Sequence, residues 1–449
     1  MSNKSKIRNY IERLKNNSFV SKLLKYAFIS FVGEGGAAFV AFFATIILIR
    51  LIGNENYGIL AVAYSFTMII DSFVNFQSWH AMISFGSVAK ENKDYASLER
   101  LIKIGSIIDF STAILGTIIT LVTASFFGSL FGWSETTIQV IYILAFQIAF
   151  NFTGTSIGII RLFDEFKLFS IFRILTEVIR LALIIILCGI FKMGLVGAAL
   201  AFTFGYIVGY IVLFLMFLNI LRKSEEVSIK GVIKSEIRSD WKKVFNFTFW
   251  TSMTASADIP VQQFDIIFLS MLSYDIVAVF KVYKQIGQVL TKFSTPLKQA
   301  VMPLFSELIT KKKFKECYSY FNQMVSKSTM LMIPLVILIT GGSMLFMYFS
   351  LDPIFLEYWY ILLIYLMLRG VALAFGAIHP LFIALGQVKK NFIISLIANA
   401  TYVAIVLVSI PYIGIWAILL GLSFEYLIVF GVKSKVVKKV ITLRLQQGS

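Results

Sequence analysis

The chain has 449 residues, of which 58% are hydrophobic and 14% are charged, and its formal net charge at pH 7 is +17. Soluble domains carry about 25% charged residues, and several apolar runs here exceed the roughly 20 residues that a helix needs to cross a bilayer. The composition therefore predicts an all-α polytopic membrane protein and argues against a soluble domain. It also argues against a membrane β-barrel, because the short alternating segments of that fold are absent.

Twelve apolar segments are long enough to span a membrane, and short polar connections separate them. The predicted spans are 26–49, 58–83, 104–127, 136–158, 169–190, 195–221, 245–270, 274–305, 328–349, 356–385, 391–410 and 414–431.

The tenth of these spans contains a proline, Pro380, directly after His379. Proline inside a helix predicts a loosened helix here, which serves as a hinge.

Lysines and arginines are distributed unevenly between the two sides that these spans define. With the N-terminus inside, the inner segments carry 33 of them and the outer segments carry two, Arg50 and Lys192. Positive charge gathers on the cytoplasmic side of membrane proteins. The split predicts a protein of the cytoplasmic membrane with both termini inside, and it accounts for the net charge without nucleic-acid binding. The inner segments are 1–25, 84–103, 159–173, 222–243, 306–327, 386–391 and 432–449.

The N-terminal segment lacks the apolar core and the small-residue cleavage site of a signal peptide. Apolar residues at Ile7, Tyr10, Ile11 and Leu14 recur among lysines and arginines. This spacing predicts an amphipathic helix that lies on the anionic surface of the membrane.

The longest inner connection divides the chain into two halves of six spans each. Short motifs recur at an offset of about 220 residues: Gly194 opens the sixth span as Gly414 opens the twelfth, and Tyr206 corresponds to Tyr426. A shared offset indicates two parallel, pseudo-symmetric repeats with a site between them. The predicted parts are a cytoplasmic amphipathic segment 1–25, a first lobe 26–221, a basic linker 222–244, a second lobe 245–431 and a basic cytoplasmic tail 432–449.

The eighth span combines an apolar surface with one charged face. Lys281, Lys284, Gln288 and Lys292 fall within about 60° of one line on a helix that turns about 100° per residue. A charge at mid-membrane costs about 2.5–3.5 kcal/mol on insertion scales, so three lysines on one face would be prohibitive against lipid. We expect this face to line water or an anionic ligand, with these four residues as candidate substrate-binding groups.

Two arginines lie mid-span in different halves, Arg180 in the fifth span and Arg369 in the tenth. Arginine binds phosphate groups bidentately, so cations from both halves suit a central anion site. Both arginines are therefore candidate substrate-binding residues. For Arg180 a second interpretation stays open, because Arg173, Glu177 and Arg180 share a helix face and are spaced to neutralise one another.

Intramembrane carboxylates are candidates for cation coupling or for structural ion pairs. Asp258 and Asp265 share one face of the seventh span, and Asp265 is placed to pair with a lysine of the eighth. A proton- or sodium-coupling role is the alternative for Asp265. Asp71 and Glu34 are the coupling candidates of the first half, although the glycines beside Glu34 also suit helix packing. Asp109 has no periodic partner and receives no role, so the candidate carboxylates are Glu34, Asp71, Glu177, Asp258 and Asp265.

No catalytic arrangement is visible in the sequence. There is no phosphate loop, no His/Cys set at metal-ligand spacing and no nucleophile motif. The two cysteines, Cys188 and Cys317, are isolated. We therefore expect no enzyme activity, no metal and no cofactor, and the absence of a nucleotide-binding domain argues against ATP drive within this chain.

A distinctive turn, Arg50-Leu-Ile-Gly-Asn-Glu-Asn-Tyr-Gly, leaves the first span. It resembles the R-x-L-G-x-x-x-Y-G turn of polysaccharide exporters in the multidrug/oligosaccharidyl-lipid/polysaccharide (MOP) superfamily. The segments at Asp265, Val277-Ala-Val-Phe-Lys-Val-Tyr and Pro303-Leu-Phe-Ser-Glu-Leu resemble the seventh and eighth helices of that family. The branch that the chain most resembles is the Wzx-type flippases. The chain departs from the family pattern at Lys281 and Lys284, which give this helix more positive charge than its small-residue versions carry. The chain also has twelve predicted spans rather than fourteen, so it resembles the lipid II flippase branch less.

The resemblance implies a MATE-like V of two six-helix bundles, which rock so that the space between them opens to each side in turn. The implied substrate is an undecaprenyl-pyrophosphate-linked oligosaccharide, whose head crosses in the cationic cavity while its polyprenyl tail stays in lipid. Membrane lipid, a coupling cation (H⁺ or Na⁺) and polysaccharide polymerase machinery are the implied partners.

The predicted function is therefore outward flipping of a lipid-linked, O-antigen-type oligosaccharide. An ion-coupled multidrug antiporter of the same fold is the main alternative, but a drug-cation exporter is expected to carry net acid in its cavity. A twelve-span facilitator would carry a G-x-x-x-D-R-x-G-R loop after its second span, and that loop is missing here. A membrane glycosyltransferase would carry a large outer loop, whereas the predicted outer loops are short.

Overall fold

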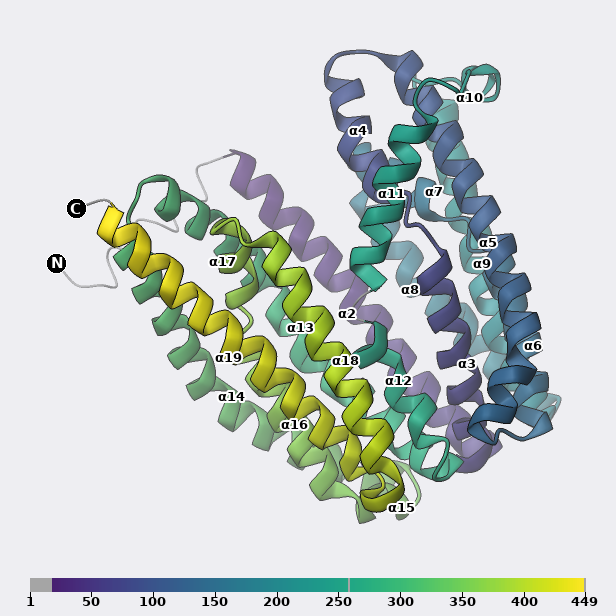
Figure 1. The fold of residues 1–449 in the computed structure, drawn as a ribbon. Coiled ribbons are helices and arrows are strands. Elements are labelled where there is room, and N and C mark those ends of the chain that lie inside the picture. The colour runs from purple at the N-terminus through teal and green to yellow at the C-terminus, as the bar shows by residue number, and fades with distance from the viewer. Residues whose placement is uncertain (1–17, 257–258, 448–449) are drawn as a thin grey trace.

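The computed structural model describes residues 18–256 and 259–447, without the side chains of 18–28, 30–31, 254–255, 260, 291–300, 302–303 and 447. Every element in this part of the chain is helical (Figure 1). The helices are α2 (Ser18–Ile52), α3 (Asn54–Val74), α4 (Trp79–Glu91), α5 (Tyr95–Phe131), α6 (Glu135–Ala149), α7 (Gly154–Leu162), α8 (Phe166–Ile184), the π-helix η1 (Ile185–Ile190), α9 (Gly194–Lys223), α10 (Ile229–Lys234), α11 (Trp241–Ser256), α12 (Ile259–Leu269), α13 (Tyr274–Thr310), α14 (Phe314–Ser350), α15 (Ile354–Glu357), α16 (Trp359–Ala374), α17 (Ile378–Ala384), α18 (Val388–Ile413) and α19 (Trp416–Gln447).

Each predicted span coincides with one helix or with consecutive helices, and the span predicted at 356–385 covers the end of α15, α16 and α17. In the described part of the chain, eight segments are long and apolar enough to cross a membrane, and the bent pair of α6 and α7 makes a ninth. Two further long helices, α8 and α13, run beside these segments but carry charges within their length. The chain is therefore a multi-pass membrane protein.

Three of the predicted spans are broken by short non-helical stretches. α3 and α4 are separated at 75–78, α6 and α7 at 150–153 with a bend of 42°, and α16 and α17 at 375–377. The last break lies just before Pro380, which has no N–H to continue the ladder, so the loosened helix predicted there is confirmed. Backbone groups freed inside a membrane need partners within the protein, and these breaks therefore gather polar side chains.

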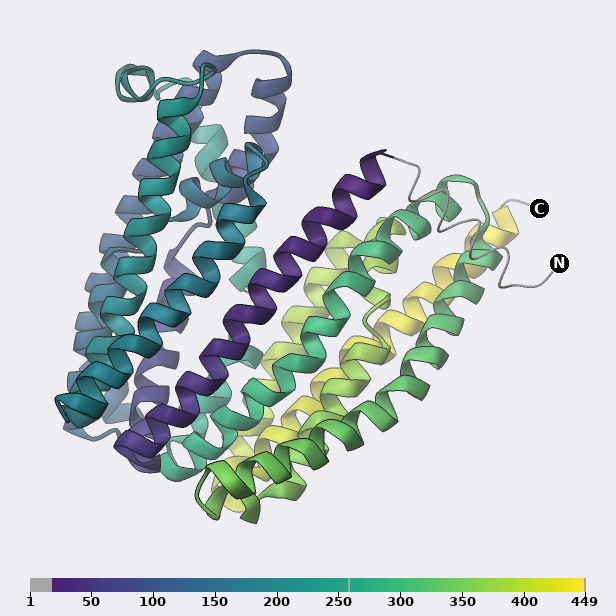
Figure 2. The same cartoon turned by 180° about the vertical axis from the view of Figure 1, so that it is seen from behind.

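The helices form two bundles that meet at one end and diverge at the other (Figures 1 and 2). In the first bundle α2 packs on α8, α5 on α6, and α8 on α9; in the second α18 packs on α19, and α14 and α13 pack on α16. α11 follows the linker but packs on α3, α4 and α5, whereas α12 contacts both α3 and α18. We call the end that carries α10 the linker end and the opposite end the α15 end.

Buried apolar side chains account for this shape. At the α15 end one continuous cluster joins the bundles, with Leu60 and Phe66 of α3 in the same core as Phe280 of α13. Toward the linker end the described core residues separate into a cluster around Met82 in the first bundle and a cluster around Phe305 in the second. A shared core at one end and separate cores at the other hold the bundles in a V.

Polar contacts also join the bundles at the α15 end, and three of them come from the turn that begins at Arg50. Arg50 donates to two backbone carbonyls at the end of α14, at 2.8 and 3.0 Å. Asn54 donates to Asp352 at 2.7 Å. Gly58 touches the backbone of α13, because a Cβ placed there would lie 1.9 Å from the carbonyl oxygen of Tyr274. This end of the molecule is closed.

Close helix packing within the first bundle depends on glycine. A Cβ on Gly33 of α2 would lie 2.5 Å from the Cβ of Ser170 on α8, and one on Gly209 of α9 would lie 2.7 Å from Thr176. Small residues let membrane helices approach each other. Of the glycines beside Glu34, Gly33 and Gly36 therefore lie in a close helix contact, whereas Gly35 does not, because nothing lies within 4 Å of a Cβ placed there.

Candidate functional site

The charged face of α13 is divided between two environments. Lys281 lies at the boundary between the bundles, where its Nζ donates to Ser65 Oγ of α3 at 3.2 Å and lies 5.5 Å from the ring centre of Tyr64. Lys284, one turn further along, is buried within the second bundle. The helical spacing predicted that the two lysines share one face and one environment. In the structure, Lys281 lies at the boundary between the bundles and Lys284 lies in the interior of the second bundle.

The same face continues toward the linker end. Gln285 donates to Thr45 Oγ1 of α2 at 3.0 Å, so α13 contacts the first bundle at two successive turns. Gln288 is exposed. The side chain of Lys292 lies outside the described residues.

Lys284 is neutralised where it stands. Its Nζ lies 2.7 Å from both carboxylate oxygens of Asp265, which is 2% exposed, and it also donates to the carbonyl of Gln262. The predicted pairing of Asp265 with a lysine is confirmed, and Lys284 is the partner. A buried pair of this kind holds α12 to α13, and separating it would leave an uncompensated charge in a low-dielectric interior.

Arg369 of α16 has no carboxylate within ion-pair distance among the described side chains. Its Nε donates to Tyr365 Oη at 2.9 Å, and one of its terminal nitrogens donates to Tyr426 Oη at 3.4 Å. Lys284 and Asp265 are close enough to act on it electrostatically. Phenol oxygens accept hydrogen bonds without supplying negative charge, so the group of Arg369, Lys284 and Asp265 keeps a net charge of +1.

Arg180 of α8 has a different environment, because it forms an ion pair with Glu177 and is buried. Its guanidinium donates to Tyr206 Oη at 2.7 Å. Tyr206 shares a hydrogen bond of 2.9 Å with Tyr64, whose ring lies beside the ammonium of Lys281. Arg180 is therefore neutralised by Glu177, the second of the two interpretations of this residue, and contacts through Tyr206 and Tyr64 connect it to Lys281.

The remaining candidate carboxylates lie in separate places. Asp71 is buried at the break between α3 and α4 and accepts a hydrogen bond of 2.8 Å from Asn151, at the break between α6 and α7. Glu34 of α2 pairs with Arg173 of α8 at 3.5 Å. Asp258 lies outside the described residues.

Asp109 of α5 is a buried carboxylate for which the sequence predicted no role. Its Oδ2 accepts hydrogen bonds from Ser78 Oγ (2.8 Å), the Thr155 amide (2.6 Å) and Thr155 Oγ1 (2.7 Å). Ser78 precedes α4 and Thr155 lies in the first turn of α7, so the carboxylate sits where two helix N-termini favour negative charge. The available signal was a hydroxyl residue, Ser78 or Thr153, at the N-cap of the helix that follows each break, but the breaks themselves were not predicted.

A second unpredicted contact fixes the end of α19. The segment predicted as a basic tail continues this helix to Gln447. Lys433 within it is fully buried, with its Nζ 3.1 Å from Nδ1 of His379 and 5.9 Å from the ring centre of Phe382. Lys433 therefore lies in a packed interface between α19 and α17, because the helix extends beyond its apolar stretch.

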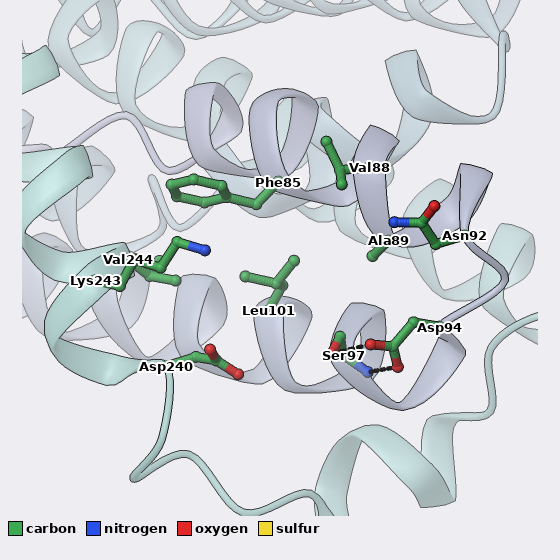
Figure 3. A pocket seen from close by; sticks show the side chains of 10 residues that line it. All are labelled: Phe85, Val88, Ala89, Asn92, Asp94, Ser97, Leu101, Asp240, Lys243 and Val244. Atoms are coloured by element: carbon green, nitrogen blue, oxygen red, sulfur yellow. Dashed lines mark hydrogen bonds between the residues drawn. The ribbon is translucent and has the colours of Figure 1, made fainter.

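A pocket of about 300 Å³ lies apart from these charges, between α4, α5 and α11 at the linker end. Figure 3 shows Asp94 and Ser97 at one side of it and Lys243 reaching toward Phe85 at the other. Hydrogen bonds from Ser97 hold the pKa of Asp94 below its ordinary value. The residues around this pocket hold α11 against the first bundle: the ammonium of Lys243 lies 4.6 Å from the ring centre of Phe85.

The geometry as a whole suits binding of an anion. Among the described side chains, Lys281 and Arg369 are the intramembrane candidate cations that form no ion pair with a carboxylate, whereas Arg180 and Lys284 are paired. Among the described residues, no group of three or more His, Cys, Asp or Glu side chains is arranged to hold a metal ion.

Solved transporter structures share this fold. A multidrug resistance MATE family transporter of the MOP superfamily in an inward-facing conformation superposes with a TM-score of 0.75, at 13% identity over 94% of this chain and 100% of that one. An outward-facing conformation gives a TM-score of 0.65 at 14% identity, covering 94% and 96% of the two chains. A MOP superfamily transporter from Pyrococcus furiosus, reported with a binding pocket of reverse polarity, gives 0.63 at 14% identity, covering 93% and 96%.

The sequence matches the family model described as polysaccharide biosynthesis protein over residues 23–309, which is more than half of the chain. No curated protein sequence matches it significantly. The matched region contains the whole first bundle, the linker and α11 to nearly the end of α13. The chain therefore belongs to the polysaccharide biosynthesis protein family and has the fold of a MOP superfamily transporter, not that of an enzyme.

Proposed function

We propose that this protein is a flippase that moves polyprenyl-diphosphate-linked oligosaccharide repeat units from the inner to the outer face of the cytoplasmic membrane. The head group crosses in the space between the two bundles, and the polyprenyl tail stays in lipid. The diphosphate is bound by Lys281 and Arg369. In this reading the chain has twelve spans, six in each lobe, with both termini in the cytoplasm.

The observation that carries this proposal is the presence of two cations without carboxylate partners in the described surroundings. Lys281 stands at the boundary between the bundles, and Arg369 is hydrogen-bonded only to two tyrosines. Unpaired charge inside a membrane is expensive and marks a functional site by default. Lysine supplies a point charge and arginine a bidentate fork, which together suit the several oxygens of a diphosphate.

The direction of opening supports transport by alternating access. The closed α15 end carries few basic residues and the linker end carries many, so the linker end is assigned to the cytoplasm. The bundles diverge toward that end (Figures 1 and 2). The greater similarity to the inward-facing MATE structure agrees with an inward-open state.

Return of the empty carrier to the inward-facing state requires a driving force. Asp71 is the carboxylate best suited to couple this return step to the binding of a cation. Glu34, Glu177 and Asp265 already have basic partners. Asp71 is buried and contacts an amide instead. It lies where two broken helices meet, which is where rocking of the bundle would change its surroundings.

The test uses a strain that lacks this gene. Completed polyprenyl-diphosphate-linked oligosaccharide is expected to accumulate on the cytoplasmic face, and the wild-type gene is expected to restore export. The Lys281→Gln/Arg369→Gln variant should not restore it at equal membrane abundance. The control is Lys192→Gln/Arg222→Gln, which removes two exposed cations and should restore export fully.

Two results would count against the proposal. Normal export in the absence of the gene, in a strain with no second flippase, would remove the glycolipid as substrate and favour the multidrug-type antiporter. Full rescue by the Lys281→Gln/Arg369→Gln variant would keep the substrate but show that the diphosphate is bound elsewhere.

A further inference from the structure

Arg161 is a half-buried arginine that none of the sequence patterns singled out. It stands in the last turn of α7, toward the linker end. Its guanidinium carbon lies 4.7 Å from the ring centre of Trp79, at the start of α4, and 5.4 Å from that of Phe169 on α8. Two aromatic rings from different helices thus hold the guanidinium by cation–π contact.

These ring contacts leave the hydrogen-bonding edge of Arg161 unused. In the part of the chain that the structure describes, the guanidinium of Arg161 makes no hydrogen bond and no ion pair, and it contacts the two rings. A guanidinium carries five N–H donors in one plane. An arginine that is positioned through its ring contacts, with its donors free, is preorganised for bidentate contact with phosphate oxygens.

The charges around Arg161 leave the group positive. Arg173 of α8 and Glu34 of α2 pair with each other at 3.5 Å, and both act electrostatically on Arg161. The three charges sum to +1, and the side chain of Arg173 is 47% exposed. Glu34 lies on α2, which packs on α8 of the first bundle and also contacts α13 of the second. A positive opening raises the local concentration of an anionic ligand.

We propose that Arg161, with Arg173 beside it, forms a capture site for the substrate diphosphate at the cytoplasmic opening, separate from the central site. This inference rests on the proposed function. Arg173 and Arg180 are two turns apart on α8, about 10 Å along its axis. From Arg180, which is paired with Glu177, the contacts through Tyr206 and Tyr64 lead to Lys281, so polar side chains connect the capture site to the central site.

The test measures association kinetics with the full-length protein in phosphatidylcholine nanodiscs. The probe is farnesyl diphosphate, and binding is followed by stopped-flow tryptophan fluorescence. Arg161→Gln is expected to lower the association rate constant about tenfold and weaken its dependence on salt, because a charge at an entrance acts mainly on the association rate. The dissociation rate constant should change less than about twofold. Lys167→Gln, which removes an exposed charge six residues away, should have little effect.

A second variant guards against misfolding. Arg161→Lys keeps the charge but not the planar fork, and it should slow association about threefold. Equal association rates for wild type and Arg161→Lys, or for Arg161→Gln and Lys167→Gln, would overturn the capture site. Repeating the measurement in phosphatidylglycerol nanodiscs separates the two phosphate sources. A persisting difference between wild type and Arg161→Gln supports the diphosphate, whereas its disappearance assigns the site to lipid headgroups and overturns the proposal.

The central site is tested in the same experiment. Absence of farnesyl diphosphate binding to the wild type would contradict the proposed function itself. Normal wild-type binding that is weakened by Lys281→Gln/Arg369→Gln but associates at the same rate in Arg161→Gln would overturn the capture site alone.

Discussion

The two bundles place an arginine against equivalent tyrosines but leave those arginines with different charges around them. Arg180 donates to Tyr206 on α9, and Arg369 donates to Tyr426 on α19. These tyrosines occupy matching positions of the repeat, about 220 residues apart. Arg180 is neutralised by Glu177, three residues earlier on the same helix, whereas no described carboxylate pairs with Arg369.

This difference shows that a buried lysine or arginine does not by itself identify an anion-binding site. Arg180 and Lys284 are more buried than Arg369 and Lys281, and each has a carboxylate that cancels its charge. Burial then makes the pair a structural element, since two opposite charges in low dielectric hold each other firmly. At the proposed central site, the positive charge available to a ligand is therefore concentrated in the second bundle and at its boundary.

The largest effect on stability is expected when the ion pair between Asp265 and Lys284 is broken. Asp265→Asn leaves Lys284 buried without its counter-charge, so we expect a loss of about 3–5 kcal/mol in the free energy of unfolding. Unfolding of the purified protein in detergent measures it. The Asp265→Asn/Lys284→Gln variant should recover most of the loss. If the double variant were as unstable as the single one, the charge of Lys284 would not be the cause.

A second prediction concerns Arg180 of the first bundle, which is paired with Glu177. Glu177→Gln removes the carboxylate and leaves Arg180 without its counter-charge. We expect destabilisation of about 2–3 kcal/mol, below the range for a fully broken buried pair because Tyr206 still accepts from Arg180. The affinity for farnesyl diphosphate should rise about threefold or more. Unchanged affinity in titration calorimetry would mean that Arg180 does not face the ligand.

The closed α15 end is tested at Gly58. Gly58→Ala adds a Cβ that meets the carbonyl of Tyr274, and such overpacking costs about 1–3 kcal/mol. The closed contact should therefore loosen. Spin labels at the exposed residues Leu130 and Tyr412 would report a longer distance between the bundles by double electron–electron resonance. Gly35→Ala is the matched control, because nothing lies within 4 Å of its added Cβ, and an equal shift in that control would contradict the contact at Gly58.

The smallest effect is expected at Asn54. Asn54→Ala removes one exposed hydrogen bond to Asp352, which contributes about 0.5–1.5 kcal/mol to keeping the α15 end closed. The same pair of spin labels should show a smaller population of the longer distance than in Gly58→Ala. A larger shift than that of Gly58→Ala would mean that polar contacts, rather than backbone packing, hold this end together.

Much of the fold could be predicted from the apolar pattern, because each membrane-spanning segment must be apolar over a fixed length. The predicted spans coincide with helices or with consecutive helices, and eight or nine of these segments in the described residues are long and apolar enough to cross a membrane. The breaks at 75–78 and 150–153 could not be predicted in this way, since no proline marks them and they depend on tertiary partners such as Asp109. The packing of α11 on the first bundle was also unpredicted, because hydropathy carries no information on helix neighbours.

The candidate site was predicted in its composition but not in its pairing. Helical spacing placed Lys281 and Lys284 on one face, yet a step of three residues turns the side chain far enough to point into a different bundle. The sequence identified Asp265 as a partner without distinguishing between the lysines. Arg161 was not identified from the sequence, because what distinguishes it is its contact with two aromatic rings. These rings come from α4 and α8, and the sequence does not show that they lie beside Arg161.

The most direct test of the two-cation site is equilibrium binding of farnesyl diphosphate to the purified protein by titration calorimetry. Loss of two charge-assisted contacts predicts that Lys281→Gln/Arg369→Gln raises the Kd about 100-fold or more, while Lys192→Gln/Arg222→Gln leaves it within about twofold. Equal dissociation constants for the wild type and Lys281→Gln/Arg369→Gln would contradict the assignment of anion binding to the second bundle.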